Sequence, residues 1–253
     1  MPRYILGDRR NDLRVQLRLQ AAYERRLQSD MAVELKRVVE NAADQLESSG
    51  DAQIGDDHRA RVMRMLEASY EVTMPAFGQR ILDAASDKRY LWRRVKQGED
   101  EFERAMRVWI RNVSAVKVTQ ISETTRQQIR DKIEAGRKAG LGTEGIAKAL
   151  RGDMVITSAV RAHIIARTET HAAAQAGNRQ AAKATGIAGL EKEWLAAEDS
   201  RTREDHNAAD GQTVDQDASF TVGGVQMEQP GDPNAPAAQV VNCRCALAFI
   251  TPE

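Results

Sequence analysis

The chain has 253 residues, enough for one large domain or two ordinary ones, and no apolar run approaches the roughly 18 residues of a membrane span. Charged residues make up 29% and aromatic residues 4%, which is typical of a helix-rich protein with an aliphatic core. The net charge is zero, but it is unevenly distributed. Residues 191–253 contain 4 Lys+Arg and 12 Asp+Glu, a balance of −8, and the residues before them have a balance of +8. The acidic tail is therefore not expected to bind phosphate groups.

Long amphipathic helices are predicted before residue 140. Apolar residues recur every three or four positions, the spacing of one helical face. One such stripe covers residues 23–46 and a second covers 62–81, where we expect Pro75 to kink the helix. A third stripe starts after the break "KQGED" and covers residues 102–133.

Shorter helices are predicted after a glycine-rich change of pattern at residues 136–145. Thr143 is expected to cap a short helix that ends at Gly152. Thr157 or Ser158 is expected to cap a longer helix that Gly186 closes.

Strands are predicted from residue 191 onward: one in "EKEWLAAE", short ones around the turn at Gly223 and Gly224, and a final one in "AQVVNCRCALAFI". The predicted fold class is therefore α+β, with long amphipathic helices in the N-terminal half and a small C-terminal module of helix plus short antiparallel strands. We expect an extended helical docking region over residues 1–139 and an α+β domain over 140–253.

One face of the longer helix carries Arg167, His171, Ala174 and Asn178 at helical spacing, with Glu169 beside it. This polar stripe is predicted to make internal bonds to the strands that follow it, for example through a bidentate arginine contact with a carboxylate. The alternative is a solvated helix face.

The stretch "AAEDSRTREDHNAADGQ" mixes carboxylates, arginines and an imidazole directly after a predicted strand. Thr202 and Asp205 have the spacing of a capping box, so much of the stretch is explained by the start of a short helix. Alternatively, Asp205, His206 and Asp210 are metal ligands or an acid/base pair. Their spacing matches no strong metallohydrolase signature.

Both cysteines, Cys243 and Cys245, lie close to the C-terminus, one residue apart. In a strand they would share one face about 6.6 Å apart at Cα, so a disulfide between them would be strained. Two thiolates can instead bind a structural Zn²⁺, with His206 as third ligand and His171 or Asp210 as fourth. The alternative is a pair of small buried side chains without a metal.

Three segments in the C-terminal half resemble the Mu F-like minor head proteins of tailed phages. They are "ARTETHAAAQAGN", "KEWLAAEDSRTREDHNAADGQTV" and "QPGDPNAPAAQVVNCRC", which have the order and spacing of that family over roughly residues 140–250. Carried over position by position, the motif residues are Arg167, Glu169, Asn178, Trp194, Asp199, Arg201, Arg203, His206, Asp210, Gly211, Asn242, Cys243 and Cys245.

The resemblance implies a phage head-morphogenesis protein, present in few copies in the virion, at the portal and in the capsid interior. The expected partners are the portal protein, capsid or scaffolding proteins and packaged DNA, with no membrane. The family's module is a compact α+β unit without an assigned enzymatic activity. Such modules also occur fused to toxin domains, which we do not expect here because the sequence ends at Glu253.

Two other functions compete with a structural role in assembly. The basic excess before residue 191 is compatible with a DNA-associated protein that is ejected with the genome. The thiols and the residues around His206 are compatible with a metal-dependent hydrolase or nuclease, although two thiolates and one histidine more often form a closed structural site. The N-terminus lacks the apolar segment of a secretory signal, so we expect synthesis in the cytoplasm of the bacterial host.

Overall fold

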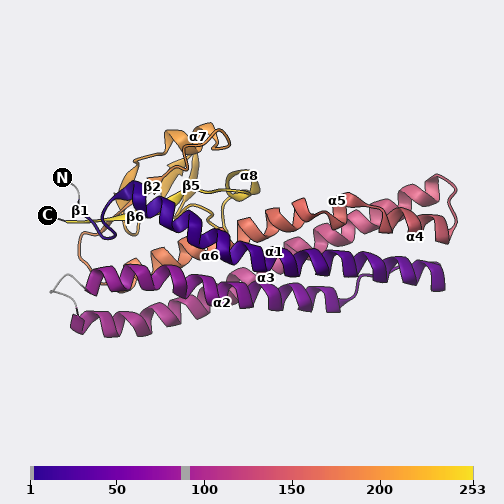
Figure 1. The fold of residues 1–253 in the computed structure, drawn as a ribbon, viewed down its shortest axis with the longest axis horizontal. Coiled ribbons are helices and arrows are strands. Elements are labelled where there is room, and N and C mark those ends of the chain that lie inside the picture. The colour runs from indigo at the N-terminus through magenta and orange to yellow at the C-terminus, as the bar shows by residue number, and fades with distance from the viewer. Residues whose placement is uncertain (1–2, 87–91, 253) are drawn as a thin grey trace. The chain divides into compact units, whose positions relative to one another are not determined.

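The computed structural model describes residues 3–86 and 92–252, which form two compact units. Unit 1 comprises Met1–Tyr23, Ser69–Ile110 and Arg167–Glu253, and unit 2 comprises Glu24–Ala68 and Arg111–Ala166. The boundaries fall inside the four long helices, which are α1 (Arg9–Ser49), α2 (Asp56–Ser86), α3 (Trp92–Lys138) and α6 (Ala159–Ala184) (Figure 1). The predicted α+β fold is confirmed, whereas the division at residue 139 stays a prediction.

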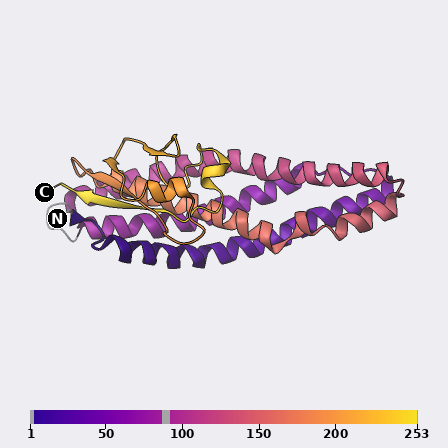
Figure 2. The ribbon, with the colours of Figure 1, turned by 90° about the horizontal axis from the view of Figure 1, so that it is seen from above.

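Unit 1 contains an antiparallel sheet in the order β1-β6-β2-β3. Because the first strand pairs with the last, the two ends of the described chain lie side by side (Figure 2). A separate hairpin turns at Gly223 and Gly224, whose positive φ angles of 55° and 77° favour glycine. The strands are β1 (Arg3–Tyr4), β2 (Glu191–Leu195), β3 (Thr213–Asp215), β4 (Phe220–Val222), β5 (Val225–Met227) and β6 (Ala246–Thr251).

Several predicted helix boundaries were wrong. The segment "KQGED" lies inside α3 instead of before it, because the third helix begins at Trp92. Gly142 occupies the N-cap of α4 (Thr143–Arg151), and no side chain caps this helix. Thr143, which was expected to be the cap, is the first residue of the helix. Ser158, in contrast, caps α6 as predicted, since its Oγ accepts the backbone N–H of Arg161 at 3.1 Å.

Three short helices divide the remaining connections: α5 (Met154–Thr157), α7 (Glu204–Ala208) and α8 (Ala237–Val240). The predicted capping box before α7 is absent, because Arg203 occupies the N-cap without a side-chain bond. The predicted final strand is also shorter than expected, since its first residues form α8 and the strand starts at Ala246. None of the described helices combines the length and apolarity that a membrane span requires.

The N-terminal helix completes the sheet of unit 1 through buried amide side chains. Gln16 on α1 donates to the backbone oxygen of Leu247 at 3.0 Å, and Gln175 on α6 accepts the backbone N–H of the same residue at 3.0 Å. The Gln16 Oε1 atom also accepts from Gln175 at 3.1 Å and from Asn178 at 2.9 Å. Side chains from two helices therefore satisfy the edge of β6 that the two-residue strand β1 leaves open.

Unit 2 is held together by the apolar stripes of its helices. Leu27, Met31 and Leu35 on α1 are buried, as the helical spacing predicted. Val116 on α3 lies within the third predicted apolar stripe but is exposed. A central cluster joins α1, α3, α4 and α5 and consists of Val38, Val39, Ala42, Leu46, Ile129, Ile133, Ile146, Leu150 and Ile156. Burial of this cluster explains why the helices of unit 2 associate.

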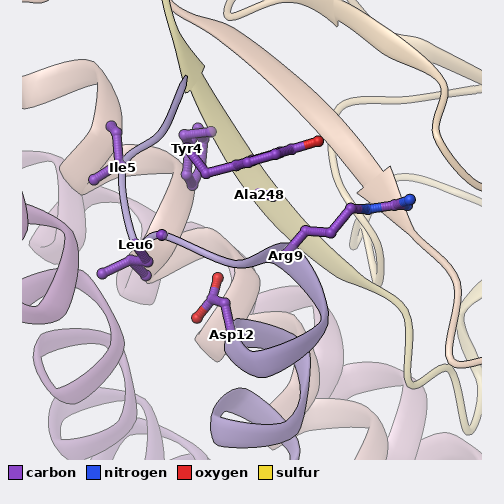
Figure 3. Close-up of a pocket in the computed structure, with 8 residues that line it drawn as sticks. Tyr4, Ile5, Leu6, Arg9, Asp12 and Ala248 are labelled. Carbon is purple, nitrogen blue, oxygen red and sulfur yellow. The ribbon is translucent and has the colours of Figure 1, made fainter. Parts of the chain in front are cut away.

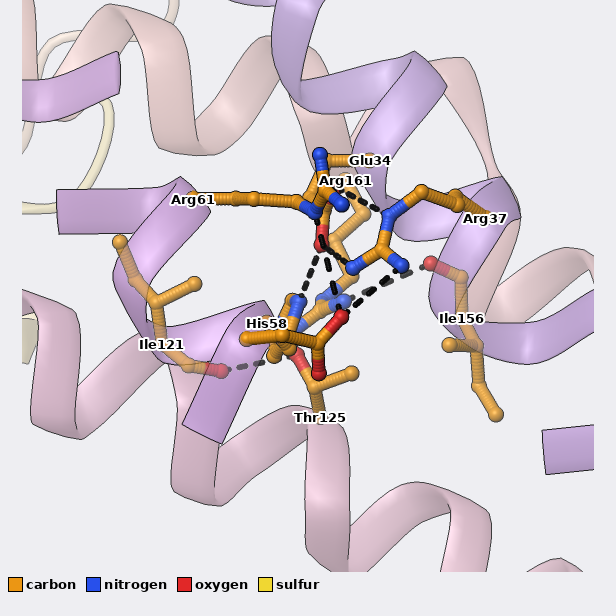
Figure 4. A network of polar contacts seen from close by, with 9 residues as sticks. Glu34, Arg37, His58, Arg61, Ile121, Thr125, Ile156 and Arg161 are labelled. Atoms are coloured by element: carbon orange, nitrogen blue, oxygen red, sulfur yellow. Dashed lines mark hydrogen bonds and ion pairs between the residues drawn. The ribbon is translucent and has the colours of Figure 1, made fainter. Parts of the chain in front are cut away.

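A buried ionic network lies within unit 2 (Figure 4). The Glu34 carboxylate contacts His58 Nδ1 at 2.7 Å and accepts from the Arg37 guanidinium at 2.7 and 2.8 Å. Arg161 donates to Thr125 Oγ1 at 2.9 Å, and burial lowers the pKa of Arg161 to about 10. The burial of Glu34 disfavours its charge, but the bonds from Arg37 and His58 outweigh this and lower the pKa of the carboxyl group.

We expect the Gln175→Leu variant to lower the free energy of unfolding by about 1–3 kcal/mol, because the buried N–H of Leu247 loses its acceptor. Urea denaturation measures this change. Gln226→Leu is the matched control, since that amide is exposed and donates to the Thr221 hydroxyl at 2.8 Å. Equal stabilities of the two variants would contradict the role of the amide cluster.

We expect Glu34→Gln to remove a pH-dependent part of the stability of unit 2. A carboxyl group whose pKa is lowered by folding stabilises the fold above its unfolded pKa of about 4.3 and loses this contribution as the pH falls through the folded pKa. The difference in unfolding free energy between wild type and variant should therefore be largest above about pH 5 and shrink below about pH 4.3. A difference that stays constant with pH would be inconsistent with this assignment.

Candidate metal centre

Three potential metal ligands converge in unit 1, and all three were predicted from the sequence. His206 lies on α7, whereas Cys243 and Cys245 lie in the segment between α8 and β6. The Nδ1 atom of His206 is 3.6 Å from the Cys243 sulfur and 3.4 Å from the Cys245 sulfur. The ligand atoms of all three residues lie within 4.8 Å of one another, and each residue is at most 2% exposed.

The cysteines do not lie in a strand, contrary to the prediction. They precede β6, and the backbone turns at Asn242, whose φ of 58° is unusual for a residue with a side chain. The N–H of Asn242 donates to the Thr168 hydroxyl at 3.2 Å, and the N–H of Cys243 donates to the Val240 oxygen at 3.1 Å. This turn directs both thiols to the imidazole on α7.

The imidazole of His206 is held by an aromatic ring and by a hydrogen bond. The ring of Trp194 meets it edge to face, with the centroids 5.4 Å apart and the planes at 88°. The Nε2 atom contacts Gln239 Oε1 at 2.8 Å, and Gln239 in turn donates to Asp205 at 2.6 Å. This contact assigns the proton to Nε2 and leaves Nδ1, the atom that faces the sulfurs, as the atom that can bind a metal.

The thiols and the imidazole share their protons unequally. The contact with Cys245 lowers the pKa of Cys243, and the pKa of Cys245 is raised by that contact and by burial. Burial disfavours the imidazolium, but the contacts with Cys245 and Gln239 outweigh this and raise the pKa of His206. Of the two thiols, Cys243 therefore has the lower pKa.

The two residues considered as fourth ligand do not join this group. The Nδ1 atom of His171 contacts Gln20 at 3.2 Å within the helical packing of unit 1. The carboxylate of Asp210 accepts from the backbone N–H of Ala196 at 2.8 Å and pairs with Arg9 at 3.1 Å. Asp210 thus helps to hold α1 beside β2. Among the described residues, the candidate metal centre therefore has only three donors, from His206, Cys243 and Cys245.

The two carboxylates that were considered as acid/base groups are bonded elsewhere. Asp205 accepts from Gln239 and from the N–H of His206, and Asp210 is bonded as described above. Cys243 and Cys245 belong to the apolar core that contains Trp194 and Phe220, and the buried His206 packs against Trp194. A buried site with these partners suits a structural role.

Glu169 and Asn178 on the longer helix make internal bonds, as predicted, but their partners lie on α2 and α1 and not on the strands that follow. Glu169 accepts from the Tyr70 hydroxyl at 2.6 Å, and both side chains are buried. Asn178 belongs to the amide cluster at Leu247. Gly211, with a φ of 76°, forms a turn in which its N–H donates to the Trp194 oxygen at 2.9 Å.

Sequence reasoning missed Gln239 and Lys192. Gln239 lies in a segment that reads as a strand, so nothing in the sequence relates it to His206. Lys192 is completely buried, donates to the Glu228 oxygen at 2.7 Å and lies 5.1 Å from the centroid of the Phe220 ring. Burial lowers the pKa of Lys192 to about 8. The sequence signal that could have identified Lys192 was its position inside a predicted strand.

A small cavity lies beneath the N-terminal segment of unit 1 (Figure 3). Its lining includes Tyr4, Ile5, Asp12 and Ala248. The volume of about 10 Å³ is at the lower limit for a single water molecule, so the cavity does not serve as a ligand site.

The comparisons with known proteins agree with the motifs. The profile of the family described as "Phage Mu protein F like protein" matches residues 127–248. The minor head protein GP7 of Bacillus phage SPP1 is 36% identical over 121 residues, which are 47% of this chain and 38% of GP7. The NAD(+)–arginine ADP-ribosyltransferase EFV of Enterococcus faecalis is 39% identical over 84 residues, which are 32% of this chain and 17% of that protein.

This chain thus spans well under half the length of either relative. No solved structure matches it significantly. The resemblance that the motifs indicated is confirmed, because the profile covers the helix with Arg167, the loop with His206 and the segment with both cysteines. Residues 127–248 of this chain therefore resemble the phage Mu protein F like family, and the chain is similar to a phage minor head protein.

Proposed function

We propose that this chain is a structural protein of phage head assembly, which acts with the portal protein in the procapsid and stays inside the capsid of the virion. The observation that carries this proposal is the match of residues 127–248 to the phage Mu protein F like family, together with the similarity of the chain to a minor head protein. Capsid or scaffolding proteins are further partners in this proposal, and packaged DNA is an alternative one.

Exposed apolar side chains in unit 2 support a docking role. Met154, Val155 and Val160 are 66–71% exposed, and they lie on or next to α5. Large apolar side chains that lie together on a surface are typical of protein–protein contact sites. The proposal assigns no enzymatic activity to the chain, and the ADP-ribosyltransferase relative shares only 17% of its length with the matched region.

We expect the full chain to co-sediment with purified portal oligomers. A Met154→Glu/Val155→Glu double variant should bind more weakly, because charges replace the exposed apolar side chains of α5. Val72→Glu is the control, since Val72 is 44% exposed but lies in unit 1. A full-length wild-type chain that stays in the supernatant would falsify the portal-docking role. Deletion of the helical front is unsuitable as a test, because β1 and Gln16 belong to unit 1.

We further propose that His206, Cys243 and Cys245 hold a structural Zn²⁺. Two sulfurs and an imidazole nitrogen are three of the four donors of a structural zinc site, and Gln239 fixes the imidazole with Nδ1 toward the sulfurs. A bound metal would link α7 to the segment before β6. The ion has a cross-linking role here and takes part in no reaction.

Elemental analysis of the purified chain should find about one zinc per chain. Cys245→Ser should lose the metal and unfold at lower temperature, whereas His163→Ala is the control, because His163 contacts Gln28 in unit 2 at 3.1 Å. Substitution of Co²⁺ into the wild-type chain should produce a thiolate charge-transfer absorption, which does not depend on the stability of any variant. Zinc-free protein without such an absorption would exclude the metal site.

A further inference from the structure

Unit 2 contains an open groove that has the size of a ligand site. Its volume is about 700 Å³, within the range of roughly 300–1,000 Å³ that is common for ligand pockets. One wall is formed by residues 51–54, which connect α1 to α2, and the other wall is a face of α3. The lining residues of α3 recur at helical spacing from Arg126 to Arg137. The groove therefore follows about three turns of α3, a length of about 16 Å.

The floor of the groove is apolar. Ile129 and Ile133 on α3 belong to the buried cluster of unit 2. Ala52 and Ile54 from the opposite wall pack against that cluster, but both remain partly exposed. An apolar side chain of a ligand that covered Ala52 and Ile54 would remove apolar surface from water, which favours binding.

The charge that remains uncompensated in the groove is positive. The other charged side chains of the lining form ion pairs within unit 2. These pairs are Asp51 with Arg137 at 3.2 Å, Arg126 with Glu123 at 2.8 Å, and Glu134 with Lys138 at 2.7 Å. Arg130 is exposed and has no ion pair with the part of the chain that the structure describes. A ligand with a negative charge would therefore supply the partner that Arg130 lacks.

The loop wall is fixed before a ligand binds. The backbone N–H of Gln53 donates to Oε1 of Gln45 on α1 at 2.8 Å. Arg137 on α3 donates to the backbone oxygen of Gly50 at 3.2 Å, in addition to its pair with Asp51. Contacts from both neighbouring helices thus hold the loop, and a preformed wall lowers the entropic cost of association.

We propose that this groove binds an extended segment of a partner protein in the phage head, in which apolar side chains flank an acidic residue. A length of about 16 Å matches about five residues of extended chain, since each residue adds about 3.3 Å. The acidic side chain pairs with Arg130, whose guanidinium group matches a carboxylate in a bidentate geometry. The apolar side chains cover Ala52 and Ile54. This inference rests on the proposed assembly function and specifies one of its contacts.

Such a segment fits the groove better than duplex DNA does. DNA carries a negative charge about every 1.7 Å along its axis, whereas the uncompensated charge of the groove is that of Arg130. Phosphate groups would also approach the carboxylates of Asp51 and Glu134 in the lining and would leave the apolar floor uncovered. A segment with one carboxylate between apolar side chains uses both the charge and the floor.

The test is an NMR titration of the full chain, ¹³C-labelled at the isoleucine δ1 methyl groups, with the peptide acetyl-Leu-Ala-Glu-Ala-Leu-amide. In an extended peptide the two leucines and the glutamate share one face. We expect the methyl resonance of Ile54 to shift and that of Ile187 to stay unchanged. Ile187 is the matched control, because it is also partly buried but lies in unit 1. A peptide with Gln in place of Glu should bind roughly two- to fivefold more weakly, the effect of one exposed ion pair.

The Arg130→Gln variant separates the ion pair from the apolar contacts. It should bind the glutamate peptide roughly two- to fivefold more weakly than the wild-type chain does, and it should bind both peptides equally well. Arg111→Gln is the matched control, since Arg111 is also exposed on α3 but does not line the groove. This control should retain the wild-type preference for the glutamate peptide.

An Ile54 resonance that does not respond to the peptide, or a wild-type chain that binds both peptides equally, would overturn the proposal. A short DNA duplex that shifts this resonance at lower concentration than the glutamate peptide would also overturn it. The result is separable from the portal experiment. Co-sedimentation without a peptide response leaves the assembly function standing and removes this groove as a contact, whereas a peptide response without co-sedimentation supports the groove and removes portal docking.

Discussion

The structure of unit 1 depends on how the open edge of β6 is satisfied. A strand edge exposes backbone N–H and C=O groups that must find partners when they are buried. Strand β1 pairs only with the end of β6, at Ile250 and Thr251. Farther along, Gln16 from α1 and Gln175 from α6 bond the backbone of Leu247. Two helices far apart in the sequence are thereby fixed to one strand, and Arg9 strengthens the junction through Glu193 and Asp210.

This constraint explains why unit 1 includes segments from both halves of the sequence. The family profile begins at residue 127, inside α3, yet unit 1 requires β1, the first turns of α1 and parts of α2 and α3. Gly177 on α6 shows how closely these helices pack, because a Cβ atom there would lie 2.5 Å from the backbone oxygen of Met74. The helical front is thus part of the structural support of the C-terminal module in unit 1.

The site around His206 ties the loops of the same unit together. In the proposed assembly role, this buried group of two thiols and an imidazole provides rigidity, because its contacts join α7 to the segment before β6. His206 is 1% exposed, so the group lies inside the unit and not on a surface that a partner would contact.

The sequence by itself determined the α+β class, the buried helix stripes and the three residues of the candidate metal centre. Those features follow from local periodicity and from the chemistry of cysteine and histidine, which a sequence displays directly. Only the tertiary structure decided that Asp210 pairs with Arg9 and that Gln239 holds the imidazole. It also decided that Gln16 completes a strand at the opposite end of the chain. Such contacts join residues up to 231 positions apart, and a polar side chain gives no local sign of which distant partner will satisfy it.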